Sequence, residues 1–207
     1  MEIKATSSSF RCAPGNPRQI REEYYERHFG PMADQIAHST DHQPVHVDIY
    51  QFEPNGLRPY WTLITGGMSD LPQNVPPSAE GILAPRAELL MYAGAPQRWM
   101  LEILKMLAEF PFRGKTYLHW YHTWTSSGHA APLPSRFSSC LFLPPCLENP
   151  PLSELQIEGD KVDFLWVVPI TERERDYAVR CGGEALEQVL FAAPADFSID
   201  GGRESVV

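Results

Sequence analysis

The chain has 207 residues, of which 43% are hydrophobic, and a formal net charge of −9; this suits one domain with a sizeable core. Residues 151–207 hold 12 Asp and Glu against 5 Lys and Arg, so most of the negative charge lies toward the end of the chain. This imbalance argues against a nucleic acid partner and favours a basic protein surface. A solvated helix face is the commoner cause of such a run. No apolar run approaches the ~20 residues that would cross a bilayer, so no membrane partner is expected.

The cysteines give no sign of a disulfide framework. Cys12, Cys140, Cys146 and Cys181 form no CxxC pair, and no secretion signal opens the sequence. We therefore expect reduced thiols and a cytoplasmic location. Cys140 and Cys146 flank a proline pair among apolar residues, which favours inert packing over redox chemistry.

The chain divides into a lead-in, one domain and a tail. Residues 1–15 are small and polar and predict a flexible lead-in, residues 16–192 form the domain, and residues 193–207 read as a tail. Asn16-Pro17 can cap and start the first helix. Gly30-Pro31 is expected to end or bend it.

Three strands are predicted in the first half of the domain. Apolar residues alternate over residues 45–50, which indicates a half-buried strand. Residues 60–65 form a second strand that Gly66-Gly67 closes, and residues 72–85 are a proline-rich loop. We read residues 86–93 as a third strand because the segment is short and lies between turn signals, although its composition also suits a helix.

One helix and two further strands follow. Apolar residues at helical spacing predict a helix over residues 96–110 that stops at Pro111. Residues 117–125 predict a wide aromatic strand. Residues 138–143 predict the next strand, which ends at a proline pair.

Residues 164–168 are an unbroken apolar run, typical of a strand covered on both faces and closed by Pro169. Thr171 and Glu174 have the spacing of a capping box, so a helix starts there. Gly182-Gly183 splits that helical stretch into two, because each glycine costs ~1 kcal/mol in a helix interior. About six strands and three or four helices, without strict βα alternation, predict an α+β fold: a single domain with a mixed, mostly antiparallel sheet.

A metal-dependent hydrolase is the enzymatic alternative. His46 and Asp48 lie two apart on one strand face, and Glu88 would complete their site. The pattern is short enough to arise by chance, and metal sites require three or four convergent ligands. His119 and His122 would point to opposite faces of their strand. We therefore expect no metal, no cofactor and no catalysis.

Five segments carry a family resemblance. They are YWTLITGGMSDL at residues 60–71, ELLMY at 88–92, Trp99 with LAEF at 107–110, LFL at 141–143, and residues 162–172 with the Gly182-Gly183 break. In this order they resemble the N-terminal domain of the Suppressor of fused family, over roughly residues 40–191. The resemblance implies a mixed-sheet α+β domain that binds proteins without catalysis. In the animal protein, a second domain clamps a strand of a Gli-type transcription factor between two halves; the segments here match only the first half.

Stand-alone domains of this kind resemble bacterial members, some of which are thought to be immunity proteins that neutralise secreted toxins. The resemblance thus implies an immunity-type inhibitor, and an acidic surface suits a basic toxin. We expect the carboxylates of the last two helices, Glu174 included, to face solvent. The aromatics of residues 117–125 lack interleaved Lys and Arg, which favours core or interface packing over base stacking. The competing mode is strand addition at an open sheet edge in that segment. The predicted partner-binding residues are Glu172, Asp176, Glu184, Glu187, Trp120, Tyr121 and Trp124.

Overall fold

The computed structural model describes residues 15–33, 37, 44–126, 131–148, 151–152, 155–193 and 203–207. Almost all of the expected lead-in, and residues 194–202 of the expected tail, lie outside this part. No helix within it is long and apolar enough to cross a membrane. The helices are α1 (Pro17–Phe29), α2 (Arg98–Gly114), α3 (Glu172–Cys181) and α4 (Gly183–Ala192), with 3-10 turns at Met68–Asp70 and Pro77–Ala79. The strands are β1 (Asp48–Phe52), β2 (Trp61–Gly66), β3 (Arg86–Ala93), β4 (Thr123–Thr125), β5 (Ser139–Leu143), β6 (Gln156–Ile157) and β7 (Asp160–Ile170).

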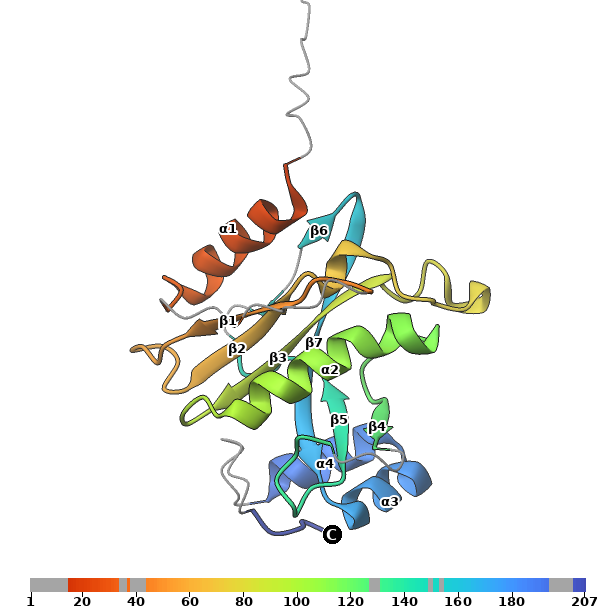
Figure 1. The fold of residues 1–207 in the computed structure, drawn as a ribbon. Coiled ribbons are helices and arrows are strands. Elements are labelled where there is room, and N and C mark those ends of the chain that lie inside the picture. The colour runs from red at the N-terminus through yellow and green to blue at the C-terminus, as the bar shows by residue number, and fades with distance from the viewer. Residues whose placement is uncertain are drawn as a thin grey trace, which may run out of the picture.

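The strands form one open mixed sheet in the order β1-β2-β3-β7-β5-β4, and β6 pairs with the start of β7 (Figure 1). Strands β3 and β7 run parallel, whereas the other neighbours are antiparallel. The predicted α+β class with a mostly antiparallel sheet is confirmed. The strand count exceeds the expected six because the two-residue β6 carries no pattern of its own.

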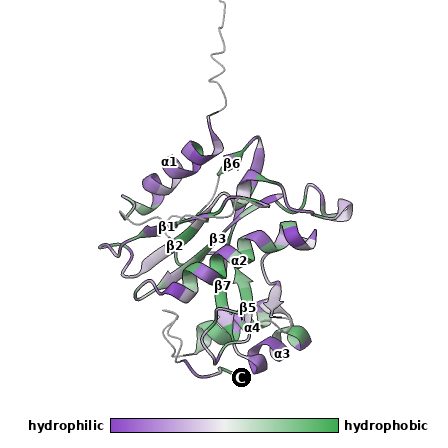
Figure 2. Ribbon diagram, in the orientation of Figure 1, coloured by the Kyte–Doolittle hydropathy of each residue, from purple (hydrophilic) through white to green (hydrophobic). Residues whose placement is uncertain are grey.

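Strand β7 is central and buried on both faces, as its apolar run predicts. Leu165 and Val167 belong to the core cluster that α2 covers. Phe164, Trp166 and Val168 belong to the opposite cluster, which α1 and α4 cover. Figure 2 shows β5 and β7 as hydrophobic elements and α3 as a largely hydrophilic one. The sheet is therefore the middle layer between helices.

The predicted helix ends are confirmed at three places. The Asn16 side chain accepts a hydrogen bond from the Arg18 amide at 3.0 Å and caps α1. The amide of Glu174 donates to the Thr171 hydroxyl at 3.3 Å, and the Glu174 carboxylate accepts from the Thr171 amide at 2.8 Å. This completes the capping box. Gly182 has a φ of 97°, so the chain turns between α3 and α4 in a region that favours glycine.

Two prolines that were expected to end a helix and a strand lie inside those elements instead. Pro111 is buried within α2, which continues to Gly114 and ends where Lys115 adopts a left-handed φ of 48°. Burial of its apolar face offsets the hydrogen bond that the proline removes. Pro169 lies within β7, beyond Trp166, the last residue that pairs with β3. Its missing N–H therefore interrupts no bond between those two strands.

The predicted aromatic strand over residues 117–125 is wrong for most of its length, because only Thr123–Thr125 form strand β4. Tyr121 has a left-handed φ of 68°, and the His122 amide donates to the His119 carbonyl at 3.2 Å, which makes a turn. Two contacts hold it. The Tyr121 amide donates to the Phe142 carbonyl at 2.6 Å, and the Trp120 indole donates to the Phe164 carbonyl at 3.0 Å.

Candidate functional site

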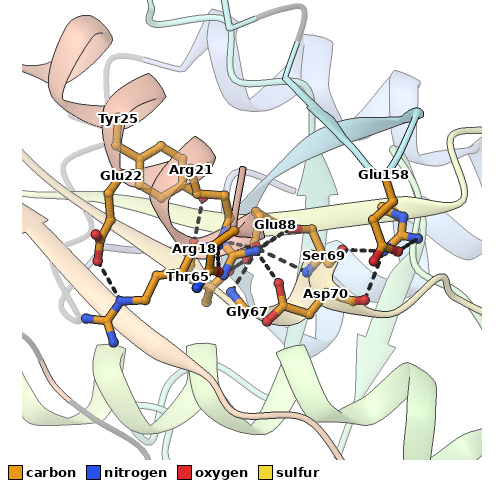
Figure 3. A network of polar contacts seen from close by, with 12 residues as sticks. Arg18, Arg21, Glu22, Tyr25, Thr65, Gly67, Ser69, Asp70, Glu88 and Glu158 are labelled. Atoms are coloured by element: carbon orange, nitrogen blue, oxygen red, sulfur yellow. Dashed lines mark hydrogen bonds and ion pairs between the residues drawn. The ribbon is translucent and has the colours of Figure 1, made fainter. Parts of the chain in front are cut away.

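Glu88 is the centre of a buried polar network between α1 and the sheet (Figure 3). Its carboxylate accepts from the Gly67 amide at 3.0 Å, the Ser69 amide at 3.0 Å and the Ser69 hydroxyl at 2.6 Å. The Thr65 hydroxyl, also at 2.6 Å, reaches the other oxygen, and Arg21 lies 3.7 Å away. Burial raises the pKa of Glu88, whereas Arg21 and these hydrogen bonds oppose the rise. Because both oxygens serve the fold, we assign Glu88 a structural role.

Arg86, two residues earlier on the same strand face, extends this network. It donates to the carbonyls of Ser69 and Asp70 at 2.9 Å each. It also pairs with Glu158 at 2.7 Å and with Asp160 at 2.9 Å. The arginine thus ties β3 to the Gly67 turn and to the hairpin between β6 and β7. The contacts of Arg86 therefore stabilise the packing of these segments within the domain.

The residues of the hydrolase alternative do not assemble into a metal site. His46 and Asp48 form a pair at 2.9 Å, as the two-residue spacing predicts. Glu88, however, uses both oxygens in the network around Ser69. The rings of His119 and His122 are 6.2 Å apart, because the turn there brings together side chains that a strand would separate. Within the described ranges, no group of three or more His, Cys, Asp or Glu is arranged to hold a metal ion.

The acidic residues of α3 are less available than the sequence predicts. Glu174 is 0% exposed at its side chain and pairs with Arg203 at 2.6 Å, so the expectation that it faces solvent is wrong. Burial would raise the pKa of Glu174, but hydrogen bonds from Arg203 and backbone amides outweigh it and lower that pKa. Glu172 and Asp176 are exposed, yet Arg175 lies 3.6 Å from the first and 2.6 Å from the second.

The acidic residues of α4 lie beside the aromatic turn. Glu184 is exposed and Glu187 is half-buried. The Tyr121 hydroxyl donates to Glu187 at 3.3 Å. Burial raises the pKa of Glu187, and the charge of Glu184 adds to the rise, whereas the bond from Tyr121 opposes it. Tyr121 and Glu187, two of the seven predicted partner-binding residues, are therefore in direct hydrogen-bond contact.

Trp120 and Trp124 are both half-buried and pack against the core cluster under α2. Trp124 also lines a surface groove of about 500 Å³. Phe110 lines the same groove, and its ring lies edge-on to the Trp124 ring, with 6.5 Å between the ring centroids. The His122 side chain lines the same groove, and burial lowers its pKa, with a smaller contribution from His119. The other lining residues are Thr116, Tyr117, Leu118, Thr123 and Thr125.

The two edges of the sheet differ. At the β1 edge, Ile49 exchanges both backbone hydrogen bonds with Ala37 at 3.1 Å, and Ala33 donates to the Gln51 carbonyl. A segment of the chain therefore occupies that edge. At the other edge β4 is the last strand, and within the described residues no strand pairs with its outer side.

The register of β4 decides which of its backbone groups point outward. The Phe142 amide of β5 donates to the His122 carbonyl at 3.0 Å, and Trp124 lies opposite Cys140. Bonding positions alternate along an antiparallel pair, so Trp124 faces β5, whereas the N–H and C=O groups of Thr123 and Thr125 face outward. The open edge thus runs along the aromatic groove.

The sequence did not reveal Phe110, Tyr117 and His122 as members of one groove. A strand would place alternate residues on opposite faces, and only the turn at Tyr121 gathers them. The one usable signal was the density of aromatic side chains in residues 117–125.

The family model of Suppressor of fused protein (SUFU) matches residues 43–204. The chain belongs to the SUFU family. A search of curated proteins finds no match. The match begins after α1 (Pro17–Phe29), so that helix lies outside the residues that the family model matches.

Solved structures of SUFU proteins share the fold. A SUFU homologue from Neisseria gonorrhoeae aligns with a TM-score of 0.68 at 20% identity, over 92% of this chain and 97% of that one. A chain of the Sufu–Fu complex aligns with a TM-score of 0.65 at 17% identity, over 94% and 93%. Drosophila Suppressor of Fused aligns with a TM-score of 0.55 at 18% identity, over 78% of this chain and 43% of that one.

Proposed function

We propose that this SUFU-family domain is a non-enzymatic protein-binding module, and that its partner adds a strand to the outer edge of β4. The observation that carries the proposal is the open edge itself: outward backbone groups of Thr123 and Thr125 lie beside an aromatic-lined groove of about 500 Å³. Backbone bonds to an edge give affinity, and pockets for alternate side chains give specificity. That one solved relative is a complex of Sufu with Fu supports a protein as the partner.

The charge of the chain supports a basic partner. The net charge is −9, and the carboxylates of Glu184 and Glu187 both act on Tyr121, in the turn that precedes β4. Complementary charge accelerates association and selects against acidic competitors. We therefore propose an immunity-type inhibitor, acting in the cytoplasm, that sequesters a cationic protein such as a toxin. Glu172 and Asp176 contribute less because Arg175 pairs with both.

A backbone substitution tests the edge. The purified protein is immobilised as bait, the proteins that it retains are identified by mass spectrometry, and the partner's affinity is then measured by calorimetry. Thr125→Pro removes an outward N–H, which an edge strand tolerates, and should weaken binding about tenfold or more. Thr125→Val is the matched control, because it loses the same hydroxyl contact with Ser139 but keeps the N–H.

Two results would contradict the proposal. Equal affinity of the Thr125→Pro and Thr125→Val variants would exclude the β4 edge. A retained partner that loses no activity in the complex would exclude an inhibitor, although not a binding module.

A further inference from the structure

Residues 203–207 lie against α3 and the segment before β5, and Arg203 makes their main contact. Its Nη1 donates to Oε1 of Glu174 at 2.6 Å, and its Nη2 donates to Oε2 at 2.8 Å. Nη2 also donates to the Pro169 carbonyl at 2.9 Å. The guanidinium carbon is 5.1 Å from the centroid of the Phe137 ring. The arginine is therefore held by a carboxylate, a carbonyl and an aromatic face.

The main chain after Arg203 is also recognised. The Val206 amide donates to Oε1 of Glu174 at 3.0 Å, and the Ser205 hydroxyl is 3.1 Å from that of Thr171. The Val206 side chain packs against the core cluster beneath α4. The receiving surface thus contacts three features of the segment: the arginine at 203, the hydroxyl at 205 and the apolar side chain at 206.

The geometry selects arginine over lysine. The Glu174 side chain is 0% exposed, so its charge requires a partner, and Arg203 is only 10% exposed there. Both carboxylate oxygens and the Pro169 carbonyl are reached by two nitrogens of one planar fork. A lysine offers a single nitrogen and cannot make the bidentate pair.

We propose that Glu174, Thr171, Phe137 and the Pro169 carbonyl form a binding site for an extended arginine-bearing segment, which the chain's own residues 203–206 occupy as a resident ligand. A partner protein that presents an arginine on an extended segment displaces them. The site adjoins the proposed partner edge, because Thr125 of β4 contacts Ser139, two residues after Phe137. This step rests on the proposed function, since it requires a protein partner.

Residues 203–206 belong to the same chain as the site, so they compete for it intramolecularly, with an effective concentration on the order of millimolar. A free peptide therefore competes poorly with the resident segment. A partner already bound at β4 has a comparable local concentration and competes well.

Peptide binding to the full chain tests the site. The probe is a fluorescent, amidated peptide with the sequence of residues 203–207, and its control carries alanine in place of the arginine. The Arg203→Ala chain should bind the probe at least about tenfold more tightly than the wild type, because its own competitor is weakened. Addition of Glu174→Gln to that variant should abolish binding. The control peptide should bind neither chain.

The Arg203→Lys chain is a second variant for the case that the alanine variant does not fold, because lysine keeps a cation beside Glu174. It should bind the probe with an affinity between those of the wild type and the alanine variant. Folded variants, by circular dichroism, that bind no better than the wild type would overturn the proposal, as would equal binding of the control peptide. Such a failure leaves strand addition at Thr125 untouched, because the peptide assay involves neither the partner nor β4.

Discussion

Glu88 and Arg21 are charged side chains in the interior, and each is retained by a specific set of partners. Arg21 reaches Glu88 and the Ser69 hydroxyl from α1, and it forms an ion pair with Asp70. Glu88 accepts two backbone amides of the turn that follows β2. Breaking such a set is costly, because the remaining charge stays buried without compensation.

We predict that Glu88→Gln destabilises the protein by about 3–5 kcal/mol. The glutamine Nε2 that replaces Oε2 cannot accept from the Thr65 hydroxyl, and the substitution leaves Arg21 without its buried counter-charge. Urea unfolding monitored by circular dichroism measures the change. Asp70→Asn is the control; it should cost less than about 1 kcal/mol, because that side chain is 44% exposed. Equal losses in the two variants would contradict the assignment.

Trp166 is the largest fully buried side chain, and it lies on the central strand. Its replacement by alanine should cost about 3–5 kcal/mol through lost burial and the cavity left behind. The comparison is Trp99→Ala on α2, where the ring is only half-buried and the loss should be smaller. Thermal or chemical melts of both variants give the answer. A nearly neutral Trp166→Ala would mean that β7 is not the core strand.

Among the elements, α4 and the aromatic turn approach each other at backbone distance. A Cβ placed on Gly183, the first residue of α4, would lie 2.5 Å from the Tyr121 carbonyl oxygen and 2.9 Å from its Cα. The turn and the helix start therefore depend on each other. Tyr121 in turn holds Glu187 and, through its amide, strand β5.

We expect Gly183→Ala to destabilise the protein by about 1–3 kcal/mol, since backbone atoms must move to admit the methyl group. Gly114→Ala at the end of α2 is the matched substitution. There a Cβ would meet only a Thr116 methyl at 3.5 Å, so alanine should be neutral or stabilising by up to about 1 kcal/mol. Equilibrium unfolding of the two variants separates the effect of steric crowding at Gly183 from the effect of helix propensity. A stabilised Gly183→Ala variant would rule out the close contact with Tyr121.

Across the whole molecule, the net charge is −9. Ion pairs with nearby arginines, and not sequence position alone, decide which of its carboxylates are available to a partner. On α3, Arg175 neutralises Asp176 and approaches Glu172. On α4, neither Glu184 nor Glu187 forms an ion pair with an arginine or lysine of the described residues, and the charges of both act on Tyr121 at the turn. The electrostatic contribution to binding should follow this difference.

With the captured partner in hand, Glu184→Gln with Glu187→Gln should slow association and flatten its decline with salt, particularly up to ~0.15 M, where the Debye length is ~8 Å. Glu172→Gln with Asp176→Asn should change the rate less. Surface plasmon resonance at low and moderate salt measures both. An unchanged rate and salt slope in the first variant would leave strand addition alone to explain binding.

Local sequence determined most of the elements. The capping box at Thr171, the break at Gly182 and the two-sided burial of β7 follow from hydrogen-bonding residue types, backbone freedom and hydrophobic pattern within a few positions of each other. The family resemblance over residues 40–191 also rests on the sequence alone, and the SUFU model match confirms it. These features are local or ordered along the chain, which is why the sequence suffices for them.

Tertiary structure decided the features that depend on distant partners. Pro111 remains inside α2 because its burial outweighs a lost hydrogen bond, and Tyr121 leaves the strand because β5 and α4 fix its backbone and hydroxyl. Glu174 lies inside because Arg203, 29 residues later, supplies its counter-charge. The open edge at β4 and its groove arise only when the sheet order is set. No local pattern encodes such contacts, because the free energy that favours them comes from residues far apart in the sequence.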